Sequence, residues 1–216
     1  LCGRLSQESR SRDQKSGMIA EKDPVLNYLR SRRLLLASRS ARRHDLFGAL
    51  GLSFELISTT VVEVPTENES AHDFVHRMAR TKVDAAVALS GSDFLISLDH
   101  RIVGKPRTAS EARTTLLALR GRAHQVVTAV HAREGGNTCL DFSAATAVHF
   151  GHYTEEDIAA YISSELPFDR AGAYGIQDYF GCFHIQRIDG DYNNVLGFPL
   201  HMFYQKMLQF LQKQEK

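Results

Sequence analysis

Short apolar runs alternate along the chain with longer segments in which apolar residues recur every three or four positions. Such runs are typical of buried strands, and the longer segments are typical of helices that bury one face. Strands are predicted at 34–37, 54–58 and 94–98. Helices are predicted at about 41–50, 70–89, 109–120, 154–164 and 200–211.

Capping signals define the ends of several predicted helices. Ser70 is followed three residues later by Asp73, and Thr108 is followed in the same way by Glu111, which is the pattern of a capping box. Gly51 follows the helix predicted at 41–50, where a glycine readily takes the left-handed conformation that ends a helix.

Two long β-type runs, 124–131 and 142–150, are joined by a segment that contains Gly135 and Gly136, and they predict a hairpin. Residues 174–191 are predicted to form short strands and turns. Helices that alternate with strands, together with a hairpin, predict an α/β fold: a mixed, elongated β-sheet flanked by helices, in two lobes around a central cleft.

The length of 216 residues and the 43% hydrophobic content fit one globular domain, predicted here at 24–216. Residues 1–23 are rich in Ser, Arg, Lys and Glu and poor in apolar residues, so they are predicted to be a disordered or non-native leader. The alternative for this segment is an organellar transit peptide, with Met18 as a downstream start.

The charge and the cysteines exclude several classes of protein. A formal net charge of +1 argues against a general nucleic-acid binder. The three cysteines, Cys2, Cys139 and Cys182, are far apart and lack zinc-site spacing, which favours a reducing, cytoplasmic compartment. No apolar run approaches the ~20 residues that cross a bilayer, so no membrane association is predicted.

An anion-binding sequence follows the first predicted strand. Ser38 to Arg43 places two hydroxyls and three guanidinium groups between a strand and a helix. Backbone N–H groups at a helix N-terminus favour anions, and arginine adds forked donors that match phosphate oxygens. Ser38, Arg42 and Arg43 are therefore candidate phosphate-site or substrate-binding residues. The alternative is a capped helix with a solvated basic turn.

Further charged residues lie at strand ends or beside apolar faces. Asp99 follows the apolar run 94–98, and Glu63 follows 59–62; together they could hold Mg²⁺, although each could also be an ordinary turn or loop residue. Lys82 borders the apolar stripe of the helix at 70–89, pointing either into a polar cleft or out to water. Lys105, between Gly104 and Pro106, supplies a further charge for phosphate.

A glycine-rich segment, 172–177, ends at Gln177. It lacks the dinucleotide-binding pattern, and its alternatives are a simple turn or the wall of a base or ribose site, with Gln177 as amide donor and acceptor.

Taken together, these segments resemble the Maf family of nucleotide pyrophosphatases. The matching stretches run in order over about residues 33–208. They are 36–43, 51–52 with 54–55, Glu63, 79–82, Asp99, 104–106, 119–122 with His124, 127–128, 169–177, and 194–195 with Gly197 and 199–200. No single motif is decisive, but the ordered series is highly specific.

The resemblance implies a hydrolase that converts a nucleoside triphosphate to the monophosphate and pyrophosphate. It also implies a divalent metal cofactor, Mg²⁺ or Mn²⁺, and a homodimer. Members of the family are connected with septum formation and with house-cleaning removal of non-canonical nucleotides. Arg42 and Gln177 match positions that go with dTTP and UTP preference, where the 7-methyl-GTP branch would place Trp and Glu.

The chain departs from the family pattern in several places. Ala41 stands where proline is usual, and His100 where the dTTP/UTP branch has threonine. The stretch between Asp99 and Gly104 is shorter than usual. Asp178 replaces a glycine and Asn193 a serine.

The resulting hypothesis is attack of water on the α-phosphorus, with pyrophosphate as the leaving group. Asp99, Lys82 and Glu63 are the predicted catalytic residues, and Glu63 and Asp99 the predicted metal ligands. Ser38, Arg42, Arg43, Lys105, His100 and Gln177 are the predicted substrate-binding residues. Two alternatives remain at this stage: a catalytically weak nucleotide-binding regulator linked to cell division, and an RNA-binding protein that uses the turn at 39–43.

Overall fold

The computed structural model describes residues 23–214 except 39, 63, 91–93 and 101–104, and gives the backbone alone at 87–90 and 94–100. The predicted leader at 1–23 lies almost wholly outside the described residues. In the described part, six strands form one sheet in the order β2-β1-β3-β4-β5-β6. The strands are β1 Leu34–Ala37, β2 Phe54–Leu56, β3 Phe94–His100, β4 Ala123–Glu134, β5 Asn137–Phe150 and β6 Ile185–Asp189. The helices are α2 Pro24–Arg30, α3 Ala41–Ala49, α4 Ala71–Ser90, α5 Ala109–Leu119, α6 Glu155–Ser163, α7 Tyr179–His184, α8 Tyr192–Leu196 and α9 Leu200–Gln214, with the 3-10 helices η1 Leu166–Asp169 and η2 Ala171–Ala173.

The sheet is mixed, as the sequence predicts. β1 is parallel to β2 and β3, and the connections through α3 and α4 allow this pairing because parallel neighbours need a crossover. β3, β4, β5 and β6 then pair antiparallel, and β4 and β5 form the predicted hairpin around Gly135 and Gly136. The α/β prediction is confirmed.

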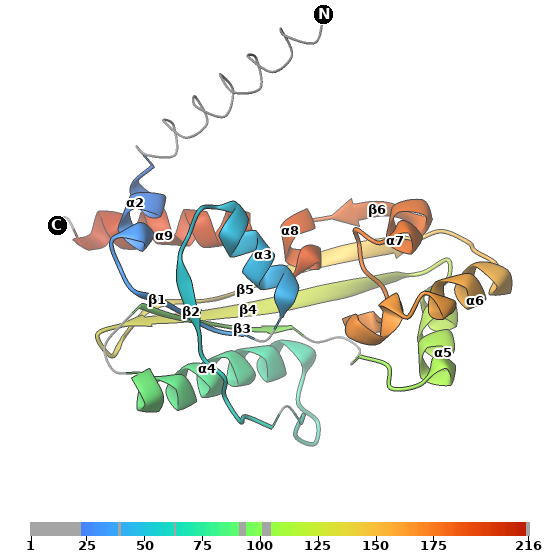
Figure 1. Ribbon diagram of the computed structural model, residues 1–216, viewed down its shortest axis with the longest axis horizontal. Helices are drawn as coiled ribbons and strands as arrows, with labels where there is room; N and C mark the ends of the chain where they lie inside the picture. Colours follow the sequence, from blue (N-terminus) through green and yellow to red (C-terminus); the bar gives the residue numbers. More distant parts are fainter. Residues whose placement is uncertain (1–22, 39, 63, 91–93, 101–104, 215–216) are drawn as a thin grey trace, which may run out of the picture.

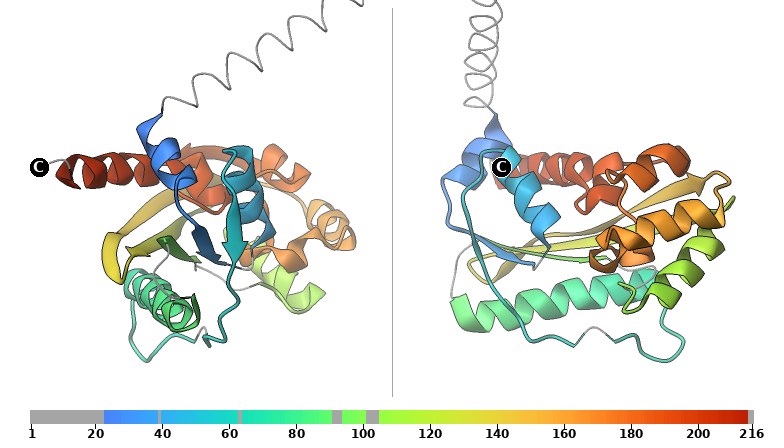
Figure 2. Two further views of the ribbon diagram at one scale, coloured as in Figure 1. Left: turned by 60° about the vertical axis from the view of Figure 1, so that its left-hand side comes forward. Right: turned by 45° about the vertical axis from the view of Figure 1, so that its right-hand side comes forward.

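Both faces of the parallel part of the sheet are covered by helices. Leu34 and Leu36 of β1 belong to a core cluster with residues of α2, α3 and α9, whereas Leu35 and Ala37 pack with α4. This alternation follows from the two-residue period of a strand. Figure 2 shows α4 on one side of the sheet and α2 and α9 on the other. Residues 34–37 therefore read as a continuous apolar run because neither face of β1 meets solvent.

The hairpin extends beyond the parallel strands to a second group of helices. There α5, α6, η2 and α7 pack around Phe150 of β5, with Tyr161 and Phe180 fully buried in the same cluster. Figure 1 shows this group at one end of β4 and β5, while α2, α3, α4 and α9 lie toward the other. The predicted two-lobed arrangement thus has a physical basis: one long hairpin carries two separate helical cores.

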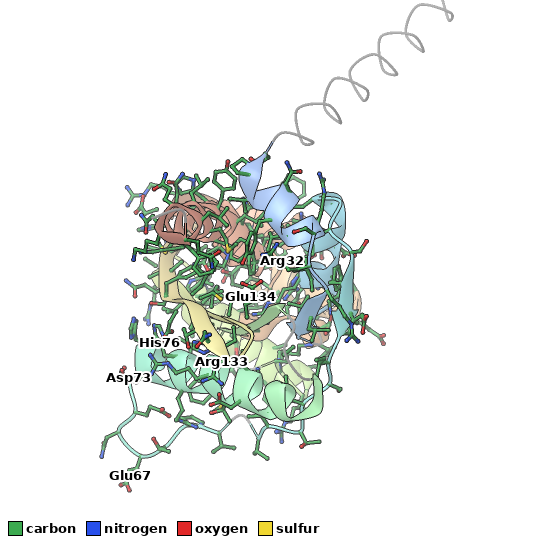
Figure 3. The ribbon with its side chains drawn as sticks, turned by 90° about the vertical axis from the view of Figure 1, so that its left-hand side faces the viewer. Arg32, Glu67, Asp73, His76, Arg133 and Glu134 are labelled. Atoms are coloured by element: carbon green, nitrogen blue, oxygen red, sulfur yellow. The ribbon has the colours of Figure 1, made fainter. Side chains whose placement is uncertain are left out.

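A polar cluster ties α2 to the turn end of the hairpin. The Tyr28 hydroxyl donates a hydrogen bond to Glu134, and Arg32 Nε lies 2.8 Å from Glu134 Oε1. The Arg32 guanidinium also lies over the Tyr28 ring, 3.6 Å from its centroid. Figure 3 shows Arg32 and Glu134 facing each other beneath α2.

Several predicted boundaries need correction. Residues 174–191 contain a helix, α7, as well as strand β6, so the prediction of short strands and turns is wrong for 179–184. α7 is six residues long, too short to show a helical period, and its packing decides its conformation. Helices α2 and α8 were not predicted, although Asp23 and Pro24 carry the N-cap and first-position signals for α2. Among the described residues, no helix combines the length and hydropathy needed to span a bilayer.

The core on the α2, α3 and α9 side allows a test of packing. Phe47 is 1% exposed, and its ring centroid lies 5.0 Å from that of Phe198. We expect Phe47→Ala to lower the free energy of unfolding by about 3–5 kcal/mol, because a buried phenyl leaves a cavity. Phe183→Ala is the matched control, because Phe183 is 79% exposed, and it should change stability by less than about 0.5 kcal/mol. Urea unfolding measures both variants, and equal losses would contradict this account of the core.

Candidate functional site

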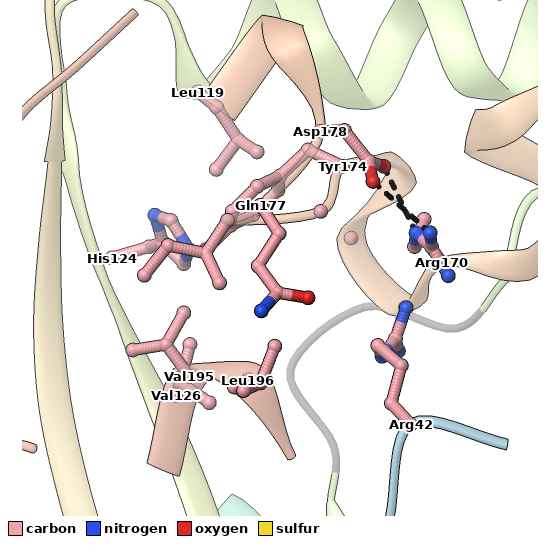
Figure 4. A pocket seen from close by; sticks show the side chains of 14 residues that line it. Arg42, Leu119, His124, Val126, Arg170, Tyr174, Gln177, Asp178, Val195 and Leu196 are labelled. Carbon is pink, nitrogen blue, oxygen red and sulfur yellow. Dashed lines mark hydrogen bonds and ion pairs between the residues drawn. The ribbon is translucent and has the colours of Figure 1, made fainter. Parts of the chain in front are cut away.

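A pocket lies where the two groups of helices meet across β4. Its walls come from the start of α3, the end of α5, strand β4, the segment from Arg170 to Asp178, and α8. Arg42, Arg170, Asp178 and Gln177 form its polar side, as Figure 4 shows. The apolar lining residues are Leu119, Val126, Ala171, Ile176, Val195 and Leu196. The arrangement suits a small ligand with a flat, partly apolar body and hydrogen-bonding edges.

Arg42 enters the pocket from the first turn of α3. Burial lowers the pKa of its guanidinium, and the neighbouring charge of Arg170 lowers it further. Its buried Nη1 has no hydrogen-bond partner among the described residues. A buried donor without an acceptor is costly, so the pocket favours a ligand that brings an acceptor to Arg42.

Arg170 differs from Arg42 because carboxylates surround it. Its Nε and Nη2 donate to the two oxygens of Asp178 at 2.9 and 3.0 Å, and its Nη1 lies 3.7 Å from Asp169. The hydrogen bond from Arg170 to Asp178 raises the pKa of Arg170. Burial acts to raise the pKa of Asp178, but hydrogen bonds from Arg170 and Tyr161 outweigh it and leave that pKa below its usual range. The charge of Arg170 is thus balanced within the protein.

Lys105 and Gln177, both predicted to bind substrate, lie on or beside this pocket. Gln177 lines it, and in Figure 4 its amide points toward the space between His124 and Arg42. Lys105 Nζ pairs with Asp169, and this hydrogen bond lowers the pKa of the Asp169 carboxyl. Both members of that pair are largely exposed.

His124 forms part of the wall opposite the arginines. Its Nε2 lies 2.8 Å from the Tyr174 hydroxyl, and its ring stacks on Phe150 with centroids 5.8 Å apart. Burial, assisted by the charge of His149, lowers the pKa of His124 to about 4, and burial raises the pKa of Tyr174. Both side chains are therefore neutral near pH 7, so this wall offers neutral hydrogen-bonding groups and aromatic surface.

Ser38 and Arg43 are buried and hydrogen-bonded to each other. Each is 8% exposed, and Arg43 Nη1 donates to Ser38 Oγ at 3.1 Å. Arg43 Nε also donates to the Gly197 carbonyl at 2.8 Å, which ties α3 to the turn after α8. Ser40 occupies the N-cap position of α3 but makes no side-chain capping bond, and Ala41 is the first helical residue. Proline fits that first position well, so alanine there suits the same backbone.

β3 runs past the end of β1. Ala37, the last residue of β1, pairs with Ser97, so the chain leaves β1 at Ser38 beside β3, and β3 ends at His100 rather than at residue 98 as predicted. β3 continues through Asp99 and His100, whose backbones pair with Ala129 and Thr128 of β4. The side chains of Asp99 and His100, and the whole of Glu63, lie outside the described residues. In the part of the chain that the structure describes, no three His, Cys, Asp or Glu side chains are grouped to hold a metal ion.

Lys82, on α4, is not among the residues that line the pocket. The stripe of Val75, Ala79, Val83 and Ala86 is fully buried, as predicted. Lys82 itself is half-buried and continues the row of Phe74 and Met78, which are 2% and 1% exposed. The structure therefore places Arg42 and Gln177 in one pocket and joins Ser38 to Arg43 by a hydrogen bond. Lys82 does not line that pocket.

Sequence reasoning did not single out Arg170, Asp178, His124 or Tyr174 as functional residues. All four line the pocket. Their only signal was membership of the Maf-like matches at His124 and 169–177, with Asp178 noted as a departure. Their grouping depends on β4 meeting the segment after α6, a contact between residues about fifty positions apart that no local pattern encodes.

The chain is similar to known proteins over most of its length. Residues 33–210 match a family model described as Maf-like protein. The dTTP/UTP pyrophosphatase of Escherichia coli strain K12 is 42% identical over 190 residues, which cover 85% of this chain and 95% of that protein. The nucleoside triphosphate pyrophosphatase of Shigella flexneri is similar to the same extent, with 42% identity over the same shares. A crystal structure of a nucleoside-triphosphatase, or dITP/XTP pyrophosphatase, from Mycobacterium abscessus covers 56% of this chain and 75% of its own at 17% identity, with a TM-score of 0.35.

The lowered pKa of His124 predicts a pH-dependent loss of stability. Between pH 6.5 and about 4 the unfolded chain binds a proton on His124 that the folded protein does not, so the free energy of unfolding falls as the pH falls. We expect this residue to account for on the order of 1 kcal/mol of the loss between pH 7 and pH 5. Urea unfolding of His124→Gln should show a smaller loss than the wild type, and the exposed control His201→Gln should not. Equal losses in all three proteins would contradict the assignment.

Proposed function

Because this chain belongs to the Maf family, it is a nucleoside triphosphate pyrophosphatase, and we propose that it acts on pyrimidine nucleotides: dTTP, UTP or modified forms of them. The reaction would release the nucleoside monophosphate and pyrophosphate. The preference for a pyrimidine base is supported by one observation: Arg42 and Gln177 line the same pocket.

In the proposed base site, the polar side of the pocket binds the edge of the base and the apolar walls cover its faces. Uracil and thymine present two carbonyl acceptors on either side of one N–H donor. Among the residues that the structure describes, the buried Arg42 Nη1 has no acceptor, and the Gln177 amide offers both a donor and an acceptor. Val126 and Val195 supply apolar surface for the faces of the ring. Base selectivity would therefore come from hydrogen bonds that a purine edge does not reproduce.

The triphosphate is proposed to lie toward Ser38, Arg43, Lys105, Lys82 and His100. Ser38 and Arg43 stand at the junction of β1 and α3, where a helix N-terminus favours anions. Lys105 pairs with Asp169 at the surface, and because exposed ion pairs are weak, a phosphate can replace that carboxylate at little cost. The charges of Arg43, Lys105 and Lys82 would stabilise the negative charge that moves onto the leaving pyrophosphate.

Catalysis is proposed to centre on Asp99 and Glu63. The backbone of Asp99 lies two residues beyond Ser97, which pairs with the last residue of β1, and carboxylates are ligands of the kind that Mg²⁺ prefers. A bound Mg²⁺ or Mn²⁺ would neutralise phosphate charge and lower the pKa of water. Asp99 would orient the attacking water and accept its proton. The new bond forms at the α-phosphorus, and the bond to the oxygen that bridges the α- and β-phosphates breaks.

The family resemblance also leads us to propose a cytoplasmic homodimer that binds neither nucleic acid nor membranes. Sedimentation of the purified protein tests the dimer.

The main test is pyrophosphate release from a panel of nucleoside triphosphates in the presence of Mg²⁺ or Mn²⁺. We expect kcat/KM to be highest for UTP or dTTP, and Asp99→Asn to lose turnover by at least about 10³-fold while retaining its melting temperature. Activity on purine nucleotides alone would contradict the proposed base site. A folded protein that binds nucleotides but releases no pyrophosphate would instead be the regulator considered from the sequence.

Lys82 provides a second test, because its role in catalysis was proposed from the sequence. Lys82→Ala should lower kcat/KM by on the order of 10²-fold if the ammonium group contacts the triphosphate. Lys206→Ala is the matched control, since Lys206 is also a half-buried helical lysine but lies on α9, which packs on the opposite face of the sheet from α4. Equal kinetics of the two variants would contradict a contact between Lys82 and the triphosphate.

A further inference from the structure

Asp178 stands at a helix start but does not serve that helix. It is the N-cap residue of α7, yet it makes no side-chain capping bond. An aspartate at this position ordinarily accepts a hydrogen bond from a backbone N–H of the first turn. Here the carboxylate turns the other way and accepts from Arg170 and from the Tyr161 hydroxyl, the latter at 2.7 Å. The Asp178 side chain therefore bonds to Arg170 and Tyr161 and not to the backbone of α7.

The same contacts fix the turn that carries Gln177. The Tyr161 hydroxyl accepts the Gly175 N–H at 3.2 Å, and the Asp178 N–H donates to the Gly175 carbonyl at 3.1 Å. A Cβ at Gly175 would lie 2.3 Å from Asp178 Oδ2 and 2.8 Å from Arg170 Nε. The Arg170–Asp178 pair thus lies directly against this glycine, and the pair and the turn are packed together.

The pair also determines which arginine is available to a ligand. Arg42 and Arg170 both line the pocket, and each charge repels the other. Asp178 takes two donors of Arg170, whereas Nη1 of Arg42 has no partner among the described residues. The side chains of Arg170 and Asp178 are only 17% and 9% exposed, so loss of the carboxylate would leave a poorly hydrated cation next to the base site.

We propose that Asp178, held in place by Tyr161, is a positioning residue for base selectivity: it keeps Arg170 out of the ligand's way and holds the Gln177 turn in register with Arg42. This inference rests on the proposed function. Tyr161 is fully buried and does not line the pocket, so any effect of its hydroxyl on base selectivity must pass through Asp178 or the turn.

The experiment compares Asp178→Asn and Tyr161→Phe with Tyr153→Phe. Tyr153 is the matched control because it is buried in the same core and its hydroxyl donates to the Leu116 carbonyl, away from the turn. Steady-state kinetics with UTP and GTP give kcat and KM for each protein. Amide hydrogen exchange over residues 175–178 of the ligand-free proteins reports on the turn without any reliance on activity.

We expect Asp178→Asn to raise KM for UTP about tenfold, Tyr161→Phe to raise it about threefold, and both to change kcat less. The ratio of kcat/KM for UTP to that for GTP should fall in both variants. Exchange at 175–178 should be faster in both. Tyr153→Phe should match the wild type in every measurement.

The outcomes distinguish a failure of the proposed base site from a failure of the positioning role of Asp178. A wild type with no preference for UTP over GTP overturns the proposed base site before any variant is compared. A wild-type preference that Asp178→Asn and Tyr161→Phe leave unchanged overturns the positioning role alone. A loss of selectivity that Tyr153→Phe shares equally also overturns that role, because it would reflect general loosening of the core.

Discussion

The side-chain amide of Asn194 connects α8 to both strands of the central hairpin. Asn194 is fully buried and donates to the Val126 carbonyl of β4 at 3.0 Å and to the Ala144 carbonyl of β5 at 3.3 Å. Buried polar groups without partners cost free energy, so these bonds fix α8 on the hairpin in one position. From that position α8 presents Val195 and Leu196 to the pocket. The hairpin is therefore both the bridge between the two cores and one wall of the site.

The pocket depends on a second constraint, the cost of burying positive charge. Two guanidinium groups share its polar side, and among the described residues only Arg170 forms a direct ion pair with a carboxylate. Arg170 is satisfied by Asp178, so the unmet donor of Arg42 makes the pocket favour a ligand with an acceptor at that point. The neutral His124 and Tyr174 opposite add no charge. The site thus has apolar walls and one polar edge, at which Arg42 needs an acceptor from the ligand.

Much of the fold could be predicted from the sequence because local periodicity reports burial directly. The run at 34–37, the stripe on α4 and the glycine turn of the hairpin all follow from one-dimensional patterns. α7 was missed because six residues show no period, and packing against Gly175 shapes it instead: a Cβ at Gly181 would lie 2.2 Å from the Gly175 carbonyl oxygen.

The candidate site was only partly predictable for the same reason. Arg42 and Gln177 carried recognisable signals in the Maf-like stretches and do lie in one pocket. Arg170 belongs to one of these stretches and Asp178 departs from the family pattern, but nothing local predicts that the two side chains form an ion pair. Conversely, Arg43 looked like a free anion-binding group, but its contacts to Ser38 and Gly197 show that it also holds α3 in place.

We propose that the pocket between α3, β4 and the turn at 174–178 holds the base of a pyrimidine nucleotide. A crystal structure with a non-hydrolysable UTP analogue tests it most directly. We expect the uracil to lie between Val126 and Val195, with one carbonyl oxygen accepting from Arg42 and its N–H or second carbonyl hydrogen-bonded to Gln177. A nucleotide bound with its base outside this pocket, or with Arg170 released from Asp178 to contact the base, would contradict it.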